Sequence, residues 1–122
     1  QHPLATLQPC ITLDQVVELM KQVSRVRISE ELKRYIVDLV GATRSQPGVA
    51  LGAGPRAPIH FMKCAQALPL LDQLEFLTPA VIQEMAVPVV AHRLILDPQA
   101  RFSGQTRAGV VKRVLETLAV PV

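Results

Sequence analysis

The chain has very few aromatic residues. Among its 122 residues there is no tryptophan, one tyrosine and three phenylalanines, although 49% of the residues are hydrophobic. The core must therefore be built from smaller aliphatic side chains, which favours packed helices over a β-sandwich, because strands are enriched in aromatics. Stacking aromatics and dense Lys/Arg runs are also absent, and the net charge is only +3. This composition argues against a nucleic-acid interface.

The chain has only two cysteines, Cys10 and Cys64. Their separation fits neither a CxxC motif nor metal-ligand spacing, and we interpret them as buried free thiols in a reducing compartment. No apolar run approaches the length that crosses a bilayer, and no signal peptide opens the chain. We therefore expect a cytoplasmic protein without membrane contact. The length predicts that residues 1–122 form a single helical domain.

The sequence contains no motif for nucleotide hydrolysis, nucleophilic catalysis or metal binding by this chain alone. There is no GxxxxGK[ST] loop to hold phosphates, and no serine-centred elbow for nucleophilic catalysis. The histidines lie on different predicted segments without ligand spacing, so no metal site is expected. Gly52–Ala57 formally fits the G-x-G-x-x-A dinucleotide fingerprint, but a helical segment precedes it and no second strand follows. We expect no catalytic residue in the isolated chain.

Apolar residues recur with helical spacing in five segments, several of which begin at a capping residue. These patterns predict an all-α fold, a compact bundle of about five helices with an extended N-terminal arm over residues 1–11, whose Leu4, Leu7 and Ile11 are expected to pack. Residues 97–105 are predicted to form a loop. The predicted helices run from Thr12 to about Val23, from Glu30 to about Arg44, from Pro55 or Pro58 to about Leu71 with a kink or early end at Pro69, from Thr78 to about Leu94 with a bend at Pro88, and from Thr106 to about Leu118.

A shaped loop over Val49–Ala57 connects two of the predicted helices. Its Gly52 and Gly54 allow close backbone approaches, and Pro55 suits a first helical turn. Arg56 follows at the expected helix N-terminus, where unpaired N–H groups and a partial positive charge attract anions. The loop predicts a phosphate-sensing arginine; an ordinary turn with a solvated arginine is the alternative.

A second candidate is an exposed apolar patch around the connection between the third and fourth helices. The first turn after Thr78-Pro79 holds no acidic residue, although that position normally favours one. An exposed apolar patch would mark a protein-binding surface. The alternative is that Phe61, Phe76 and Val81 belong to the core. The candidate patch consists of Pro58, Phe61, Leu74, Leu77, Ala80 and Val81.

The chain resembles the C-terminal lid of MoxR-type AAA+ ATPases along nearly all of its length. Residues 51–57, Leu-Gly-Ala-Gly-Pro-Arg-Ala, are similar to the family motif L-G-A-S-P-R-A. Thr78-Pro79 and residues 88–94, Pro-Val-Val-Ala-His-Arg-Leu, match a later helix of that lid. His2-Pro3-Leu4, with Leu7 and Pro9, resembles the segment that leads into it.

The resemblance implies a helical lid that closes over ATP bound on a preceding αβα core. Arg56 falls at the sensor-2 arginine, which reaches the γ-phosphate, and Gly52, Gly54 and Pro55 shape its loop. ATP and Mg²⁺ are then expected only in a full-length ATPase. The implied partners are the AAA+ core, neighbouring subunits of a hexameric ring and a protein with a von Willebrand factor A domain, in chaperone-like remodelling.

Departures from the family pattern concentrate on one surface. Gly54 replaces Ser, Gln73-Leu74 replaces Gly-Arg, and Ala80-Val81 replaces Asp-Asp, while Pro58, His60 and Pro69 are unusual in their helix. Most of these changes make the surface more apolar, which an interface can use. A lid that has diverged, or been redesigned, to bind an unrelated protein through the candidate patch is therefore the alternative function.

Overall fold

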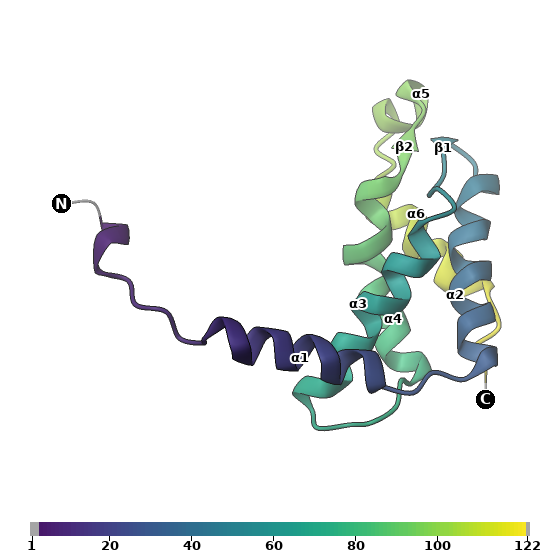
Figure 1. The fold of residues 1–122 in the computed structure, drawn as a ribbon. Helices are drawn as coiled ribbons and strands as arrows, with labels where there is room; N and C mark the ends of the chain where they lie inside the picture. Colours follow the sequence, from purple (N-terminus) through teal and green to yellow (C-terminus); the bar gives the residue numbers. More distant parts are fainter. Residues whose placement is uncertain (1–2, 122) are drawn as a thin grey trace.

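The structure is a computed structural model that describes residues 3–121. The prediction of an all-α bundle is confirmed, with one small antiparallel sheet added (Figure 1). The sequence patterns predict neither the second strand nor the short fifth helix. The α-helices are α1 (Leu13–Arg25), α2 (Glu30–Ala42), α3 (Ala57–Leu71), α4 (Pro79–Val90), α5 (Pro98–Phe102) and α6 (Arg107–Thr117). The shorter elements are the 3-10 helices η1 (Pro3–Thr6), η2 (Thr43–Ser45) and η3 (Ala91–Arg93), and the strands β1 (Val49–Leu51) and β2 (Ile95–Leu96).

Four helices begin at a hydroxyl residue that caps the first turn. The side chains of Thr12, Ser29, Thr78 and Thr106 each accept a hydrogen bond from the backbone N–H three residues later. At Thr12 the Gln15 side chain also accepts from the Thr12 backbone N–H, which completes the predicted capping box. The sequence start signals for these helices are therefore confirmed.

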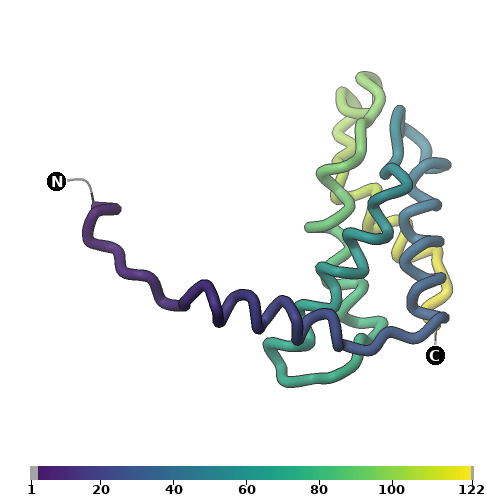
Figure 2. The backbone as a smooth tube through the Cα atoms, in the orientation of Figure 1, coloured from purple at the N-terminus to yellow at the C-terminus, as the bar shows by residue number. Residues whose placement is uncertain are grey.

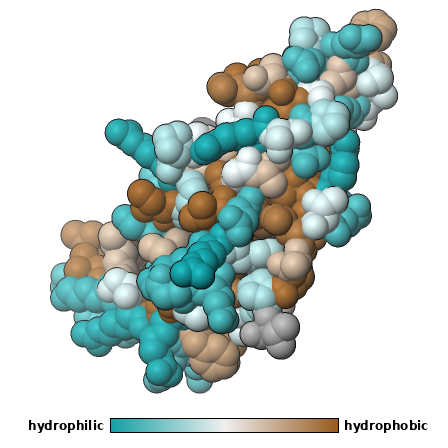
Figure 3. All heavy atoms as spheres, turned by 90° about the vertical axis from the view of Figure 1, so that its right-hand side faces the viewer, coloured by the Kyte–Doolittle hydropathy of each residue, from teal (hydrophilic) through white to brown (hydrophobic). Residues whose placement is uncertain are grey.

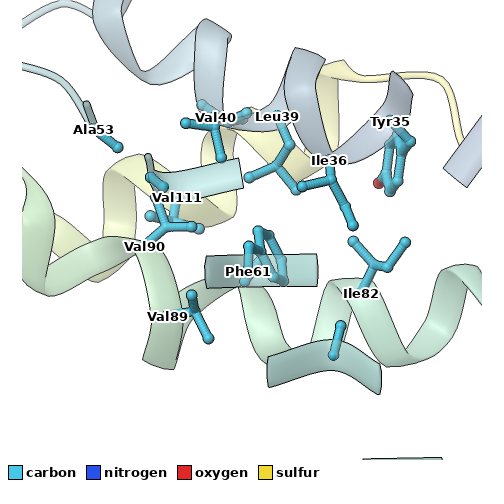
Figure 4. Packing of buried hydrophobic residues seen from close by; sticks show 14 of the residues in the cluster. Tyr35, Ile36, Leu39, Val40, Ala53, Phe61, Ile82, Val89, Val90 and Val111 are labelled. Carbon is cyan, nitrogen blue, oxygen red and sulfur yellow. The ribbon is translucent and has the colours of Figure 1, made fainter. Parts of the chain in front are cut away.

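The core lies among α2, α3, α4 and α6, and Phe61 is its largest fully buried side chain. Phe61 of α3 has no exposed surface and lies among residues from α2 and α4, including Ile36, Leu39 and Ile82 (Figure 4). Val111 adds the inner face of α6. Since a buried phenylalanine removes a large apolar area from water, this residue anchors α3 at the centre of the bundle.

Two contacts fix the region around the end of α3. The buried Gln66 side chain donates through Nε2 to the Val26 carbonyl oxygen at 2.7 Å. Arg27 pairs as an isolated parallel bridge with Phe76, in the segment between α3 and α4. α3 continues through Pro69 and ends at Leu71, so the predicted end near Leu71 is confirmed and the helix does not end early at Pro69. The residues after α1 are thus tied both to α3 and to the α3–α4 loop.

The N-terminal part of α1 extends away from the bundle (Figures 1 and 2). No side chain of α1 is fully buried. Leu13 is 77% exposed and Met20 68%, although both lie on the apolar face that the sequence predicts to pack. The expected anchors Leu7 and Ile11 are likewise exposed, as is Leu4. Gln1 and His2, at the start of the predicted arm, lie outside the described residues.

The expectation of buried thiols is wrong, because Cys10 and Cys64 are both exposed. Cys10 precedes α1, and Cys64 lies on the face of α3 that is turned toward α1. Among residues 3–121, no helix has the length and apolar character needed to cross a membrane.

Candidate phosphate-binding site

The loop after β1 runs directly against the chain of η2. A Cβ atom on Gly52 would lie 2.7 Å from the Cα and Cγ atoms of Arg44. Real Cβ atoms do not approach other heavy atoms this closely, so only glycine allows this contact without a shift of the backbone. By contrast, a Cβ atom on Gly54 would meet nothing within 4 Å. Glycine is therefore sterically required at the first of these positions and not at the second.

Ala53 is held from both sides by η2. The buried Thr43 hydroxyl accepts a hydrogen bond from the Ala53 N–H at 3.1 Å and donates to the Val40 carbonyl oxygen at 2.6 Å. Arg44 donates through Nε to the Ala53 carbonyl oxygen at 3.1 Å. Ala53 and Ala57 are both buried, one on each side of the Gly54–Arg56 turn. The backbone that carries Arg56 is thus fixed before and after the turn.

Arg56 occupies the N-cap position of α3 and its side chain is exposed. The Ala57 N–H donates to the Gly54 carbonyl oxygen at 3.0 Å, which closes the turn. No side chain caps this helix, and its first turn holds no acidic residue. Pro58 is the second residue of the helix. The loop and cap therefore present a cation beside a helix N-terminus, where an anion is stabilised.

The small sheet brings a second segment to this end of the bundle. β1 pairs antiparallel with β2, and Val49 lies opposite Leu96. Figure 1 shows β1 and β2 side by side at one end of the bundle. η3 ends one residue before β2, so Arg93 is close in the chain to the strand that pairs with β1. Its Nη2 atom is 3.2 Å from Nδ1 of His60, which lies on the second turn of α3. The sequence motif around His92 and Arg93 gives no indication of this contact with α3.

The arginines of this region have no carboxylate partner in the part of the chain that the structure describes. The ion pairs found there are on exposed faces of α1 and α2, where Lys21 meets Glu18 and Lys33 meets Glu30. The hydrogen bond from Lys33 lowers the pKa of the Glu30 carboxyl. Within residues 3–121, no three side chains of the metal-binding types come together.

The six residues of the predicted apolar patch do not form one exposed surface. Phe61 and Leu77 are buried in the core, which corrects their expected exposure, and Val81 is half-buried against that core. Pro58 lies at the start of α3, whereas Leu74 lies beyond its end and Ala80 is exposed on the first turn of α4. On the face shown in Figure 3, hydrophobic side chains lie in separate areas between hydrophilic ones.

Several exposed apolar residues lie on α1 and the neighbouring face of α3. A shallow apolar groove between these helices is lined by Leu19, Val23, Leu68 and Leu71. The helical spacing of Leu13, Val16, Val17 and Met20 predicts an apolar face on α1. Its exposure was not predicted, because helical spacing does not identify what covers a face.

The family model described as the AAA lid domain matches residues 41–114, which is more than half of the chain. The match includes the loop with Arg56, all of α3 and α4, and η3 with Arg93. The chain also aligns with MoxR of Paracoccus denitrificans at 32% identity, over 62% of this chain and 26% of that protein, and with MoxR1 of Mycobacterium tuberculosis. This chain is an AAA lid domain of the MoxR type. The similarity to the MoxR-type lid that the sequence motifs indicate is therefore confirmed.

Relatives of the lid domain are considerably longer than this chain. The lid is 38% identical over 99% of its length to YeaC of Bacillus subtilis, a protein whose own function is not characterised, and it covers 38% of YeaC. It is 31% identical over 77% of its length to the chaperone MoxR1 of Mycobacterium tuberculosis, of which it covers 27%. A solved structure of a candidate ATPase from Cytophaga hutchinsonii superposes with a TM-score of 0.83 at 26% identity, over 89% of the lid and 36% of that protein.

Proposed function

We propose that this lid domain closes over a nucleoside triphosphate bound to an AAA+ core, and that Arg56 contacts its terminal phosphate as the sensor-2 arginine. One observation carries the proposal: Arg56 is an exposed cation on a rigidly held turn at the N-terminus of α3, without an acidic partner in residues 3–121. A guanidinium at this position stabilises negative charge that develops on a transferred phosphoryl group.

The residues present fit the phosphate end of the nucleotide. Arg56 supplies charge and hydrogen-bond donors, while the contacts of Thr43 and Arg44 with Ala53 keep its backbone in place. Such preorganisation matters because a backbone that is already held loses less conformational entropy when Arg56 contacts the phosphate. The nucleotide-binding core and the Mg²⁺ ligands belong, in this proposal, to the part of the ATPase outside this lid.

The proposal is tested in a chimera that joins the core region of YeaC to this lid in place of YeaC's own matching region. The chimera should bind ATP and hydrolyse it. Arg56→Ala should lower kcat about 10- to 150-fold, the range of one hydrogen bond to a charged group. Arg107→Ala is the matched control, because Arg107 is also an exposed arginine at a helix start. Normal turnover in Arg56→Ala, or no ATP binding by the chimera, would contradict the proposal.

We also propose that the exposed face of α1 contacts the AAA+ core. The superposition with the Cytophaga hutchinsonii protein covers 89% of the lid, whereas residues 26–122 make up only about four-fifths of it. Part of residues 1–25 therefore superposes on a chain about two and a half times as long as this lid. The apolar side chains of α1 supply the kind of surface that intramolecular domain contacts bury.

Hydrogen exchange tests this contact with the core. In the chimera, α1 should exchange more slowly than in the isolated lid, and Val17→Asp should remove the difference. The same substitution at Val37, an exposed apolar residue of α2, is the control. Equal exchange of α1 in the chimera and the isolated lid would exclude the contact.

A chaperone-like role and a partner with a von Willebrand factor A domain remain proposals for the longer ATPase. The alternative role, binding of an unrelated protein through the six-residue patch, is weakened because two of the six residues are buried. A pull-down with the lid as bait separates these proposals. Equal capture of a von Willebrand factor A protein by the Ala80→Asp/Val81→Asp variant supports the ATPase role; capture of another protein by the original lid alone supports the alternative.

A further inference from the structure

A second arginine lies beside the proposed contact of Arg56 with phosphate. The His60 N–H donates to the Arg56 carbonyl oxygen at 3.2 Å, so these two residues are one helical turn apart. Residues at this spacing project from the same face of a helix. Since Arg93 contacts the His60 ring at 3.2 Å, its guanidinium lies next to that face.

Two hydrogen bonds hold Arg93 in place. Its Nε atom donates to the Val89 carbonyl oxygen at 3.0 Å, and Nη2 meets Nδ1 of His60. A guanidinium only donates, so Nδ1 of His60 is the acceptor in this contact. Of the five N–H donors of Arg93, three remain for a ligand. The side chain is half-buried, and this restricts its motion.

The cluster of Arg56, His60 and Arg93 has an excess of positive charge. Neither arginine pairs with a carboxylate in residues 3–121, and the first turn of α3 contains no acidic side chain. Arg93 uses its donors on the His60 ring and a carbonyl oxygen, neither of which supplies a negative charge. Two guanidinium groups near a helix N-terminus form a site for an anion with several oxygens.

We propose that Arg93 is a second phosphate-binding residue of the lid and that His60 positions it. The ligand class is the polyphosphate chain of a nucleoside triphosphate, and the inference rests on the proposed function. Arg56 and Arg93 come from different segments, the start of α3 and η3. A polyphosphate presents oxygens along its length, which two separate guanidinium groups can contact together.

Nucleotide affinity in the YeaC-core chimera tests this proposal. Arg93→Gln keeps an amide donor for the Val89 carbonyl oxygen but removes the charge, and it should weaken ATP binding about tenfold or more. The same substitution should change the affinity for ADP less than the affinity for ATP. Arg107→Ala is the control, and its affinity for ATP should equal that of the original chimera. If Arg56→Ala weakens ATP binding while Arg93→Gln stays within twofold of the original chimera, this inference is wrong and the proposed function stands. No effect of Arg56→Ala on binding or turnover contradicts the proposed function itself.

The role of His60 is tested by a pair of substitutions. His60→Asn places an oxygen acceptor near the position of Nδ1, so ATP affinity should stay near that of the original chimera. His60→Ala removes the acceptor and should weaken affinity without lowering the melting temperature. Equal affinities for the two variants would refute the positioning role.

A measurement on the isolated lid completes the test. In nitrogen NMR, addition of inorganic tripolyphosphate should shift the side-chain signals of both Arg56 and Arg93, while Arg107 stays unchanged. A shift of Arg56 without any shift of Arg93 would contradict the second contact.

Discussion

Gly52 offers the sharpest test of how the loop positions Arg56. In Gly52→Ala the new methyl group would lie 2.7 Å from Arg44 Cα and 2.8 Å from its backbone nitrogen. Backbone atoms cannot rotate away as the end of a side chain can, so the loop or η2 must move. Overpacking of this kind costs about 1–3 kcal/mol.

The matched control is Gly54→Ala, two residues along the same loop. Its Cβ atom would meet nothing within 4 Å, and its backbone does not lie in the left-handed region. Replacement of glycine at such a position stabilises a protein by about 0.4–1 kcal/mol, because the unfolded chain loses freedom. The two substitutions remove the same kind of residue and should change the free energy of unfolding in opposite directions.

Thermal unfolding followed by circular dichroism measures both effects. For a chain of this size, 1 kcal/mol corresponds to a shift of about 3–5 °C in Tm. Gly52→Ala should therefore lower Tm by about 3–15 °C, whereas Gly54→Ala should leave it unchanged or raise it by a few degrees. If Gly52→Ala melts at or above the temperature of the original lid, the steric argument for this glycine is refuted.

Three further substitutions test buried polar groups. Thr43→Val should destabilise the lid by about 1–3 kcal/mol in urea unfolding, because the buried Ala53 N–H loses its acceptor, whereas Thr43→Ser should retain most of the stability. Gln66→Leu should cost about 1–3 kcal/mol by leaving the buried Val26 carbonyl oxygen unpaired, and a stability equal to that of the original lid would contradict the importance of this bond. Tyr35→Phe should leave the free energy of unfolding unchanged or raise it, since the buried Tyr35 hydroxyl has no hydrogen-bond partner among the described residues. A fall in that free energy of more than about 1 kcal/mol would contradict this and reveal a hydrogen bond of the hydroxyl.

Local signals in the sequence account for most of the helical fold. Thr12, Ser29, Thr78 and Thr106 were identifiable as helix starts because capping depends on residues within one turn. The same holds for Arg56, whose placement follows from the glycines and proline just before it. The candidate site was therefore predictable where its geometry is determined by neighbours in the chain.

Features that depend on distant segments were not predictable. The contact of Arg93 with His60 joins residues 33 positions apart, and neither residue carries a local signal for it. The burial of Phe61 and Leu77, like the exposure of α1, is decided by which helices meet in three dimensions. Periodicity identifies an apolar face but not its partner.

The two ends of α3 have different neighbours, so the helix connects the proposed phosphate site to the region beside α1. Arg56 lies at its first turn, whereas Gln66 and the groove beside α1 lie along its second half. A helix of 15 residues is a stiff rod of about 22 Å. A tilt of α3 by about 10° would therefore displace one end by almost 4 Å relative to the other. A tilt of α3 that begins at the phosphate end would in this way move its other end, beside α1, by several ångströms.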